Sequence, residues 1–379
     1  MLLPFILFLT TVIASPLQTP LNTEYEILSP YSSHRSISPR VFIVTMFEPE
    51  ESAWTKHMNY VHHFVVPGLS PLHPQVHCTA DYQICHFTTG EGEINAANSM
   101  MSILLNPKFN LRDTFWLLNG IGGGTPTEVT TGSVTFAKYA IQVGLQYQID
   151  PKELTGYPDW PTGYFSYGAK DPWGYPDSVY GTEVFELNEN LRDRAIAAGK
   201  RVEQSLDIGN DENIALRNQF PAPGNAKPFV KGCDVLTSDN YWIGETFDNY
   251  FIEYSKLITN GSATYCSAAQ EENATLEAIL RLSKFGYVNY ERVIVMRAIS
   301  NFVKAPEGFN DPVDFFHNYP KGGIELSLNN LYKVGIEVVK DILDNYDEVC
   351  ALKASNYLGD IFGTLGGVRD FGKDKYTVH

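Results

Sequence analysis

The chain has 379 residues, of which 44% are hydrophobic and 13% aromatic, and its formal net charge is −16 at pH 7. This composition is typical of a globular protein with a large buried core, and the length permits one α/β domain or two smaller ones. The negative charge argues against nucleic acid polymers as partners, because their phosphates need surfaces rich in Lys and Arg. It suits a neutral small ligand better than a polyanion, although acidity also serves solubility alone.

The N-terminus has the features of a targeting segment. Residues 2–14 are apolar and end in Val12-Ile13-Ala14-Ser15, which offers small residues for signal-peptide cleavage. The alternative is a buried N-terminal strand. We expect a signal peptide at 1–14, a Pro- and Ser-rich linker at 15–39 and a single domain at 40–379. The mature protein would be secreted or associated with the cell surface.

The rest of the sequence contains no stretch that is long and apolar enough to span a bilayer, which predicts a soluble mature protein. Such a protein could not carry a solute across a membrane without a partner. No cysteine has the spacing of a metal ligand, and we expect neither a metal nor another cofactor.

The five cysteines are compatible with an oxidising compartment but too few for a disulfide framework. They are Cys78, Cys85, Cys233, Cys266 and Cys350. Cys78 and Cys85 could bridge if the segment between them turns, and the odd number leaves at least one cysteine free. Of two glycosylation sequons, the one at Asn260 is expected in a turn and the one at Asn273 inside the candidate site.

The first predicted strand is the β-branched run at residues 40–47, followed by acidic residues 48–51 and a helix from Ser52 or Ala53. Carboxylates at the carboxyl end of a strand lie where open α/β sheets bind ligands. The alternative is that Glu50 and Glu51 only interact favourably with the helix dipole.

Two glycine-rich turns are predicted next. Residues 82–89 are expected to form a strand and residues 94–105 a helix, with Gly90-Glu91-Gly92-Glu93 as the turn between them. The glycines allow the backbone to approach a ligand closely. The acidic side chains of this turn disfavour a dianion as the ligand. The strand at 114–119 runs into Gly120–Pro126. Its glycines, Gly122 and Gly123 among them, predict a tight turn or a flat wall against a planar ligand.

The middle of the chain is less informative. Residues 132–150 are strand-like, and residues 158–180 are expected to form a long surface loop, either a lid, a subunit contact or an ordinarily packed loop. A helix is expected near 189–200. After a strand at 231–237, Tyr241 and Trp242 could stack on a planar ligand, with core packing as the alternative.

The strongest pattern lies near the C-terminus. Residues 270–276 begin a helix capped by Asn273 or Ser267, and we expect Glu272 to point towards the sheet edge. Residues 293–301 form a buried strand that delivers Ser300 and Asn301 to that edge. A long amphipathic helix at 323–346 belongs to the core.

These last two segments, Gln270–Leu276 and Arg297-Ala298-Ile299-Ser300-Asn301, resemble the paired signature of the nucleoside phosphorylase and nucleosidase superfamily. From about Arg40 onwards the chain is similar to the family labelled purine nucleoside permeases. The resemblance implies an α/β fold with three α/β/α layers and a mixed central sheet. It also implies a purine nucleoside ligand, with a homo-oligomer and a membrane transporter as candidate partners.

The resemblance further implies roles for individual residues. Glu50 would activate the attacking water, and Glu272, with its neighbour Glu271, would accept hydrogen bonds from ribose hydroxyls. Gly90 and Gly92 match a turn that holds phosphate in phosphorylases, and the later glycine run matches a turn beside base and ribose. Arg297 would support the strand end electrostatically rather than contact the ligand.

Asn301 departs from the commonest superfamily pattern, which has Asp at this position. An Asp can protonate N7 of a purine, whereas an amide can only donate a hydrogen bond to N7 and O6. This favours the 6-oxopurine nucleosides inosine and guanosine, or a protein that binds without much catalysis.

The sequence favours hydrolysis of the N-glycosidic bond by water, because no Arg occurs in the acidic segment or in either glycine turn to hold phosphate. Phosphorolysis is the alternative within the enzyme class. A non-catalytic nucleoside-binding component of uptake is the alternative from another class, and it needs Glu272 and Asn301 but not Glu50. A storage protein that kept only the fold is a third.

Overall fold

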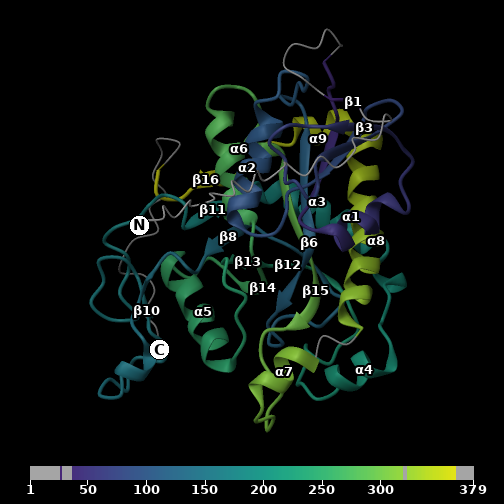
Figure 1. Cartoon of the computed structure of the whole chain (residues 1–379). Coiled ribbons are helices and arrows are strands. Elements are labelled where there is room, and N and C mark those ends of the chain that lie inside the picture. The colour runs from purple at the N-terminus through teal and green to yellow at the C-terminus, as the bar shows by residue number, and fades with distance from the viewer. Residues whose placement is uncertain (1–25, 28–35, 319–321, 364–379) are drawn as a thin grey trace, which may run out of the picture.

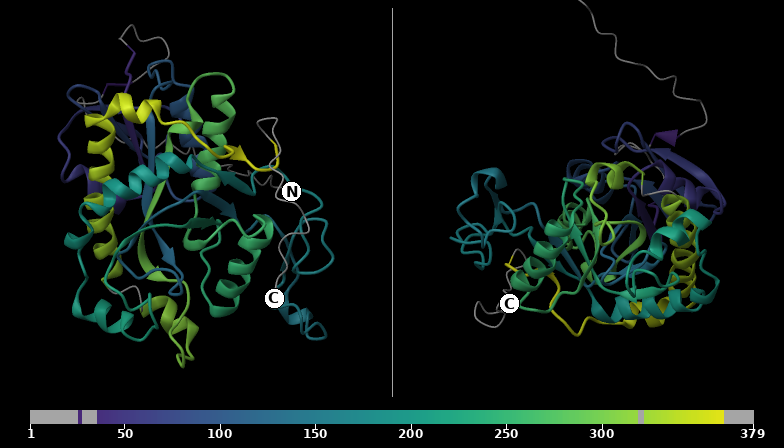
Figure 2. Two further views of the ribbon diagram at one scale, coloured as in Figure 1. Left: turned by 180° about the vertical axis from the view of Figure 1, so that it is seen from behind. Right: turned by 90° about the horizontal axis from the view of Figure 1, so that it is seen from below.

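The computed structural model describes residues 26–27, 36–318 and 322–363. Within this part of the chain, a mixed sheet of 14 strands lies between layers of helices (Figures 1 and 2). This confirms the predicted α/β class and its mixed central sheet. The expected signal peptide at 1–14 and most of the expected linker at 15–39 lie outside the described residues.

The strands follow the order β1-β3-β4-β5-β2-β6-β14-β13-β8-β11-β16 across the sheet, and β15 pairs with both β6 and β7, while β12 pairs with β7. Their bounds are β1 Glu26–Ile27, β2 Val41–Thr45, β3 Tyr60–Val65, β4 Gln75–Thr79, β5 Ile84–Thr88, β6 Phe115–Gly124, β7 Val134–Phe136, β8 Tyr139–Gln142, β11 Val184–Glu186, β12 Val230–Gly232, β13 Asp234–Thr237, β14 Tyr265–Ala269, β15 Val293–Phe302 and β16 Gly359–Asp360. A separate ribbon pairs β9 Tyr147–Gln148 with β10 Tyr164–Phe165.

The α-helices are α1 Glu48–Thr55, α2 Glu93–Leu104, α3 Glu189–Lys200, α4 Asp211–Arg217, α5 Glu245–Ile258, α6 Glu272–Ser283, α7 Pro312–Asn318, α8 Gly323–Asp344 and α9 Tyr346–Ala351. Short 3₁₀ turns span Pro151–Glu153, Glu203–Ser205 and Tyr290–Arg292. The helix expected near 189–200 and the long C-terminal helix are therefore where the sequence predicted them.

Alternate residues of the central strands face two different helical layers. Phe42 and Val44 of β2 pack in the cluster that includes α2 and α6, whereas Val41 and Ile43 pack in the cluster that includes α1, α3 and α8. The parallel strands β2, β6 and β15 are buried on both faces. Packing from both sides therefore holds the carboxyl ends of these strands in place.

Two helices begin at other residues than the sequence predicted. α1 begins at Glu48, so the acidic residues form its first turn rather than a loop before it. Pro49 explains this start, since proline suits the first helical turn. α6 begins at Glu272 with Glu271 as the N-cap residue, while Ser267 lies within β14, so neither Asn273 nor Ser267 is the cap.

The glycine run continues β6 as an extended strand instead of forming a tight turn. Its glycines have no positive φ, and they pair with β15. The reason for glycine is space: an added Cβ would lie 2.7 Å from the Ala268 carbonyl oxygen at Gly122, and 2.9 Å from Val303 Cγ1 at Gly123. The predicted tight turn was therefore wrong, and the flat wall against a planar ligand stays a prediction.

Two disulfides join neighbouring strand segments. Cys78 and Cys85 face each other across β4 and β5 and are bonded, as the sequence allowed. The bond between Cys233 and Cys266 was not predicted, because only the pairing of β13 with β14 brings these distant positions together. Cys350 is free.

The sequon at Asn260 has the expected setting, whereas Asn273 is buried but does not line the cavity described below. Asn260 follows α5 in a turn with a positive φ of 51°. Asn273 is buried, and its Nδ2 donates to the carbonyl oxygen of Thr182 at 2.7 Å, so glycosylation there is blocked.

We predict that Gly122→Ala destabilises the fold by about 1–3 kcal/mol, because the added methyl group overlaps a backbone oxygen that cannot rotate away. The measurement is the free energy of unfolding in denaturant. Gly156→Ala is the matched control, since nothing lies within 4 Å of its added Cβ. Equal stabilities for both variants would contradict this explanation of the glycine run.

Candidate functional site

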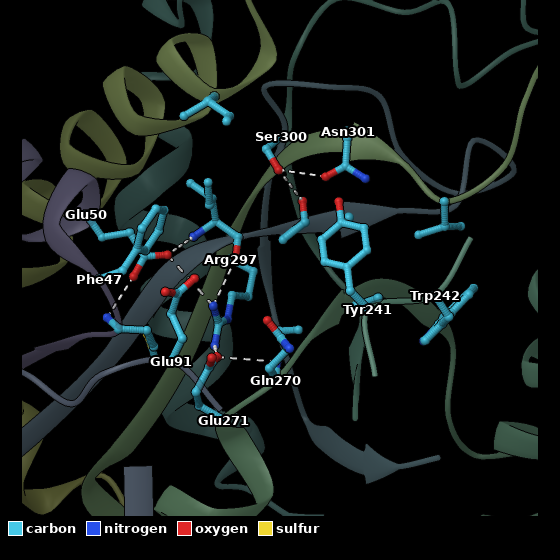
Figure 3. Close-up of a pocket in the computed structure, with 18 of the residues that line it drawn as sticks. Phe47, Glu50, Glu91, Tyr241, Trp242, Gln270, Glu271, Arg297, Ser300 and Asn301 are labelled. Atoms are coloured by element: carbon cyan, nitrogen blue, oxygen red, sulfur yellow. Dashed lines mark hydrogen bonds and ion pairs between the residues drawn. The ribbon is translucent and has the colours of Figure 1, made fainter. Parts of the chain in front are cut away.

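A cavity of 260 Å³ opens at the carboxyl ends of the central strands (Figure 3). Segments distant in sequence converge on it: the ends of β2 and β15, the first turn of α1, and the loop after β13. It is lined by Met46, Phe47, Glu50, Glu91, Ile121, Gly122, Gly123, Asn240, Tyr241, Trp242, Ala268, Ala269, Gln270, Glu271, Arg297, Ser300, Asn301, Val303 and Ile324. This is the edge at which open α/β sheets bind ligands.

One guanidinium organises the floor of the cavity. Arg297 is 2% exposed, and its Nη2 donates to Glu271 Oε2 at 2.9 Å while its Nε donates to Glu272 Oε1. Its Nη1 donates to the Ile121 carbonyl oxygen at 2.9 Å and lies 4.0 Å from Glu50 Oε1. A single buried cation therefore compensates three buried carboxylates.

Glu50 lies on the cavity wall and is 1% exposed. The backbone N–H groups of Met46 and Ile121 donate to its Oε2 and Oε1 at 2.7 and 2.6 Å. Burial raises the pKa of Glu50 to about 8; Arg297 opposes this shift and Glu271 adds to it. Glu50 is thus a fixed carboxyl group that changes its protonation state near neutral pH, as a general base or acid must.

The neighbouring acids of α1 have different surroundings. Glu51 accepts hydrogen bonds from His73 at 3.1 Å and His77 at 3.0 Å, away from the cavity. Although burial by itself would raise it, these histidines hold the pKa of Glu51 well below its usual range. Glu48 is exposed and does not line the cavity. Of the three acids in this turn, only Glu50 faces the cavity.

The turn at residues 90–93, which resembles a phosphate-binding turn of phosphorylases, binds carboxylates of the protein itself. The Gly92 N–H donates to Glu271 Oε1 at 3.0 Å, and the Glu93 N–H donates to Asp239 Oδ1 at 2.8 Å. Gly90 and Gly92 both have positive φ, as a close turn requires, but neither lines the cavity. These two N–H groups at the start of α2 are thus already occupied by the protein's own anions.

Ser300 and Asn301 end β15 on the cavity wall, as predicted. Ser300 Oγ lies 2.9 Å from Asn301 Oδ1, and it also donates to the Gly122 carbonyl oxygen at 3.1 Å. Asn301 Nδ2 donates to the Phe302 carbonyl oxygen at 3.3 Å, and the Asn301 side chain also hydrogen-bonds with the Tyr241 hydroxyl. A ligand that accepts a hydrogen bond from the Asn301 amide therefore takes the place of one of these partners.

Aromatic rings form another part of the wall. Tyr241 is 56% exposed, which contradicts core packing for this ring, and it meets Phe316 of α7 edge-on at 5.6 Å. Trp242 lines the cavity and also packs on Phe251 at 4.8 Å, so it has the contact expected for core packing, and its stacking on a ligand stays a prediction. Figure 3 shows the Tyr241 hydroxyl directed towards the end of β15.

The carboxylate that faces the cavity is Glu271, not Glu272. We expected Glu272 to point at the sheet edge, but it is fully buried beneath Arg297 and lines no part of the cavity. The reason is the position at which α6 begins. Glu271 is the N-cap residue between the end of β14 at Ala269 and the helix, whereas Glu272 is the first helical residue.

Arg297 has the electrostatic contacts expected of a residue that supports the strand end, and it also lines the cavity. A signal was available in the sequence. An Arg within a buried apolar strand must be paired, and acidic residues near a predicted sheet edge are the obvious partners.

The long segment 158–180 contributes no residue to the cavity described here, and Trp173 within it packs on Tyr250 at 5.3 Å. This agrees with ordinary loop packing.

Residues 38–353 match the model of the purine nucleoside permease family. The chain belongs to this family. It is 48% identical over 348 residues to a purine nucleoside permease of Candida albicans, covering 90% of this chain and 84% of that protein. It is 34% identical over 319 residues to a probable purine nucleoside permease of Schizosaccharomyces pombe, covering 81% of this chain and 90% of that one.

Solved structures with this fold include nucleosidases. The 5′-methylthioadenosine/S-adenosylhomocysteine nucleosidase of Neisseria meningitidis, in complex with methylthio-immucillin-A, aligns with a TM-score of 0.51. The futalosine hydrolase of Helicobacter pylori aligns with a TM-score of 0.50. Each alignment covers 80% of this chain and at least 98% of the other chain, at 12% identity. The family has the nucleoside phosphorylase-like fold that the sequence predicted.

Two further findings concern the described residues alone. No helix among them is long and apolar enough to cross a membrane. No group of three or more His, Cys, Asp or Glu residues among them is arranged to hold a metal ion.

We predict that Arg297→Met destabilises the protein by about 3–5 kcal/mol, because the buried carboxylates of Glu271 and Glu272 lose their compensating charge. The loss should shrink as the pH falls and these carboxylates gain protons. Chemical denaturation at pH 5 and pH 7 measures both effects. Arg281→Met is the control, since its pair with Glu277 is on the surface and contributes at most about 0.5 kcal/mol.

Proposed function

We propose that this protein binds a purine nucleoside in the cavity and cleaves its N-glycosidic bond with water, using Glu50 as the general base. The single observation that carries the proposal is the setting of Glu50, a buried carboxyl group on the cavity wall with a pKa raised to about 8. Each of its oxygens accepts one backbone hydrogen bond, which leaves lone pairs for a water molecule.

In this proposal, Glu50 takes a proton from water as the water oxygen bonds to the anomeric carbon. Glu271, which faces the cavity, takes the role of accepting hydrogen bonds from ribose that we first assigned to Glu272. Its negative charge also stabilises the positive charge that develops on the sugar. The Asn301 amide donates to N7 or O6 of the departing base, which favours inosine and guanosine.

Water is favoured over phosphate by the occupation of the cationic groups. Arg297 is the only Arg or Lys among the described lining residues, and each of its nitrogens already donates to the protein. The N–H groups of Gly92 and Glu93 also have carboxylate partners. A phosphate dianion would thus have to displace existing bonds next to Glu271 and Glu91. Phosphorolysis remains the second proposal within the enzyme class.

The family name favours a second candidate from another class, a nucleoside-binding component of uptake that acts with a membrane transporter. Such a component would use the same cavity without needing Glu50 to change its protonation state. Base release separates the two candidates.

We further propose that the mature protein is secreted. The two disulfides support this, because such bonds persist in oxidising compartments. The expected result is a mature N-terminus near Ser15 and a glycan on Asn260, measured by mass spectrometry of protein from its native host. An intact Met1 on unglycosylated, cell-associated protein would contradict this.

The main test measures release of free base from inosine, guanosine and adenosine, with and without phosphate. We expect release from inosine and guanosine that does not depend on phosphate. Release only with phosphate would identify a phosphorylase, and binding without release under any condition would favour the uptake component.

Glu50→Gln should lower turnover roughly 10²–10⁴-fold, because the amide cannot accept the water proton, while inosine still protects the protein thermally. For the wild type, kcat/KM should rise with pH and level off above about 8, since Glu50 acts only after it loses its proton. Glu48→Gln is the matched control and should behave as wild type, because Glu48 is exposed and outside the cavity. A Glu50→Gln variant with normal turnover would end this assignment.

A further inference from the structure

The charges around the cavity are strongly unequal. Glu50, Glu91 and Glu271 line it, and Arg297 is the only lining Arg or Lys in the part of the chain that the structure describes. The carboxylates of Glu91, Glu271 and Glu272 outnumber this one cation, whereas Glu50, with its pKa raised to about 8, adds a negative charge only when it loses its proton. This excess of carboxylates favours a cationic ligand over an anionic one.

The single charge of Arg297 offsets only part of this negative charge, and its nitrogens are not available to a ligand. Its three nitrogens donate to Glu272, Glu271 and the Ile121 carbonyl oxygen. Because all three nitrogens have partners within the protein, no N–H group of Arg297 is left to bind a ligand in the cavity. A positively charged ligand would therefore be attracted by the carboxylates that Arg297 leaves uncompensated.

The rings on the wall suit a flat ligand with that charge. Phe47, Tyr241 and Trp242 line the cavity from two sides of the sheet edge (Figure 3). An aromatic face attracts a cation that lies over it, and stacking holds a planar heterocycle in addition.

The chemistry of Asn301 also favours a positively charged ligand. A neutral purine leaves more readily when an acid protonates it, whereas the amide of Asn301 can donate a hydrogen bond but has no proton to release. A heterocycle that already carries a positive charge needs no acid, because it leaves as a neutral molecule. The acidic cavity and the missing acid therefore favour the same kind of substrate.

We propose that the preferred substrates are ribosides whose leaving heterocycle carries a fixed positive charge, such as pyridinium ribosides and N7-alkylated purine nucleosides. This rests on the proposed hydrolysis by Glu50 and names its substrate class. The bond between the anomeric carbon and the ring nitrogen breaks, and its electron pair neutralises the heterocycle. The water oxygen bonds to the anomeric carbon, and Glu50 accepts the water proton and later releases it to solvent. The products are a neutral base, ribose and one proton.

The test compares nicotinamide riboside, a permanently charged pyridinium nucleoside, with inosine and with the uncharged dihydro form of the same riboside. We expect kcat/KM for nicotinamide riboside to exceed that for inosine by about tenfold or more, and its Kd to be lower than that of the dihydro form. Base release and calorimetric binding are the two measurements.

Two variants test the two halves of the reasoning. Asn301→Asp supplies the missing acid, so it should raise kcat/KM for inosine and lower the preference for nicotinamide riboside about tenfold. Glu91→Gln removes one cavity charge and should lower kcat/KM for nicotinamide riboside several-fold more than for inosine. Asp347→Asn on α9 removes the same charge from an exposed position outside the cavity, and should leave the preference unchanged.

The outcomes separate this inference from the function on which it rests. Base release from inosine but not from nicotinamide riboside would overturn the inference and leave nucleoside hydrolysis intact. Release from neither would overturn hydrolysis, and equal binding of the charged and dihydro ribosides would then overturn the charge preference as well. An equal effect of Glu91→Gln and Asp347→Asn would also contradict it, because overall charge would then be sufficient.

Discussion

The ion pairs of Arg297 are the constraint on which this site depends. A guanidinium buried to 2% exposure is stable only if charged partners surround it, and here Glu271 and Glu272 hydrogen-bond to it while Glu50 lies 4.0 Å away. These carboxylates come from α1 and from the start of α6, which are far apart in the sequence. Their common partner therefore joins two helices to β15 at the point where the cavity opens.

The backbone around Arg297 is arranged to leave room for these groups. Gly120 lies against Glu50 and the Arg297 guanidinium, so that any Cβ at this position would overlap both. The extended glycine run of β6 thus forms a flat floor and permits close approach of charged side chains. The backbone N–H groups of Met46 and Ile121 hold Glu50 in place, and its burial raises the pKa of this carboxyl group although Arg297 opposes the shift.

The family is named for transport, whereas its fold is shared with nucleosidases. The two descriptions make different demands on the same cavity. Recognition needs a planar wall, a donor amide and a carboxylate, and catalysis adds a group that exchanges a proton near neutral pH. The setting of Glu50 meets the additional demand, and this observation is what supports catalysis in our proposal.

The sequence by itself determined the α/β class, the strand that carries Ser300 and Asn301, and the position of Glu50 just after the first predicted strand, because periodicity and strand ends are local properties. It could not decide which of Glu271 and Glu272 faces the ligand, since one residue of difference in the start of α6 reverses them. Nor could it place Arg297 in the cavity or pair Cys233 with Cys266. Those facts depend on which strands become neighbours in the sheet, and only the tertiary structure decides that.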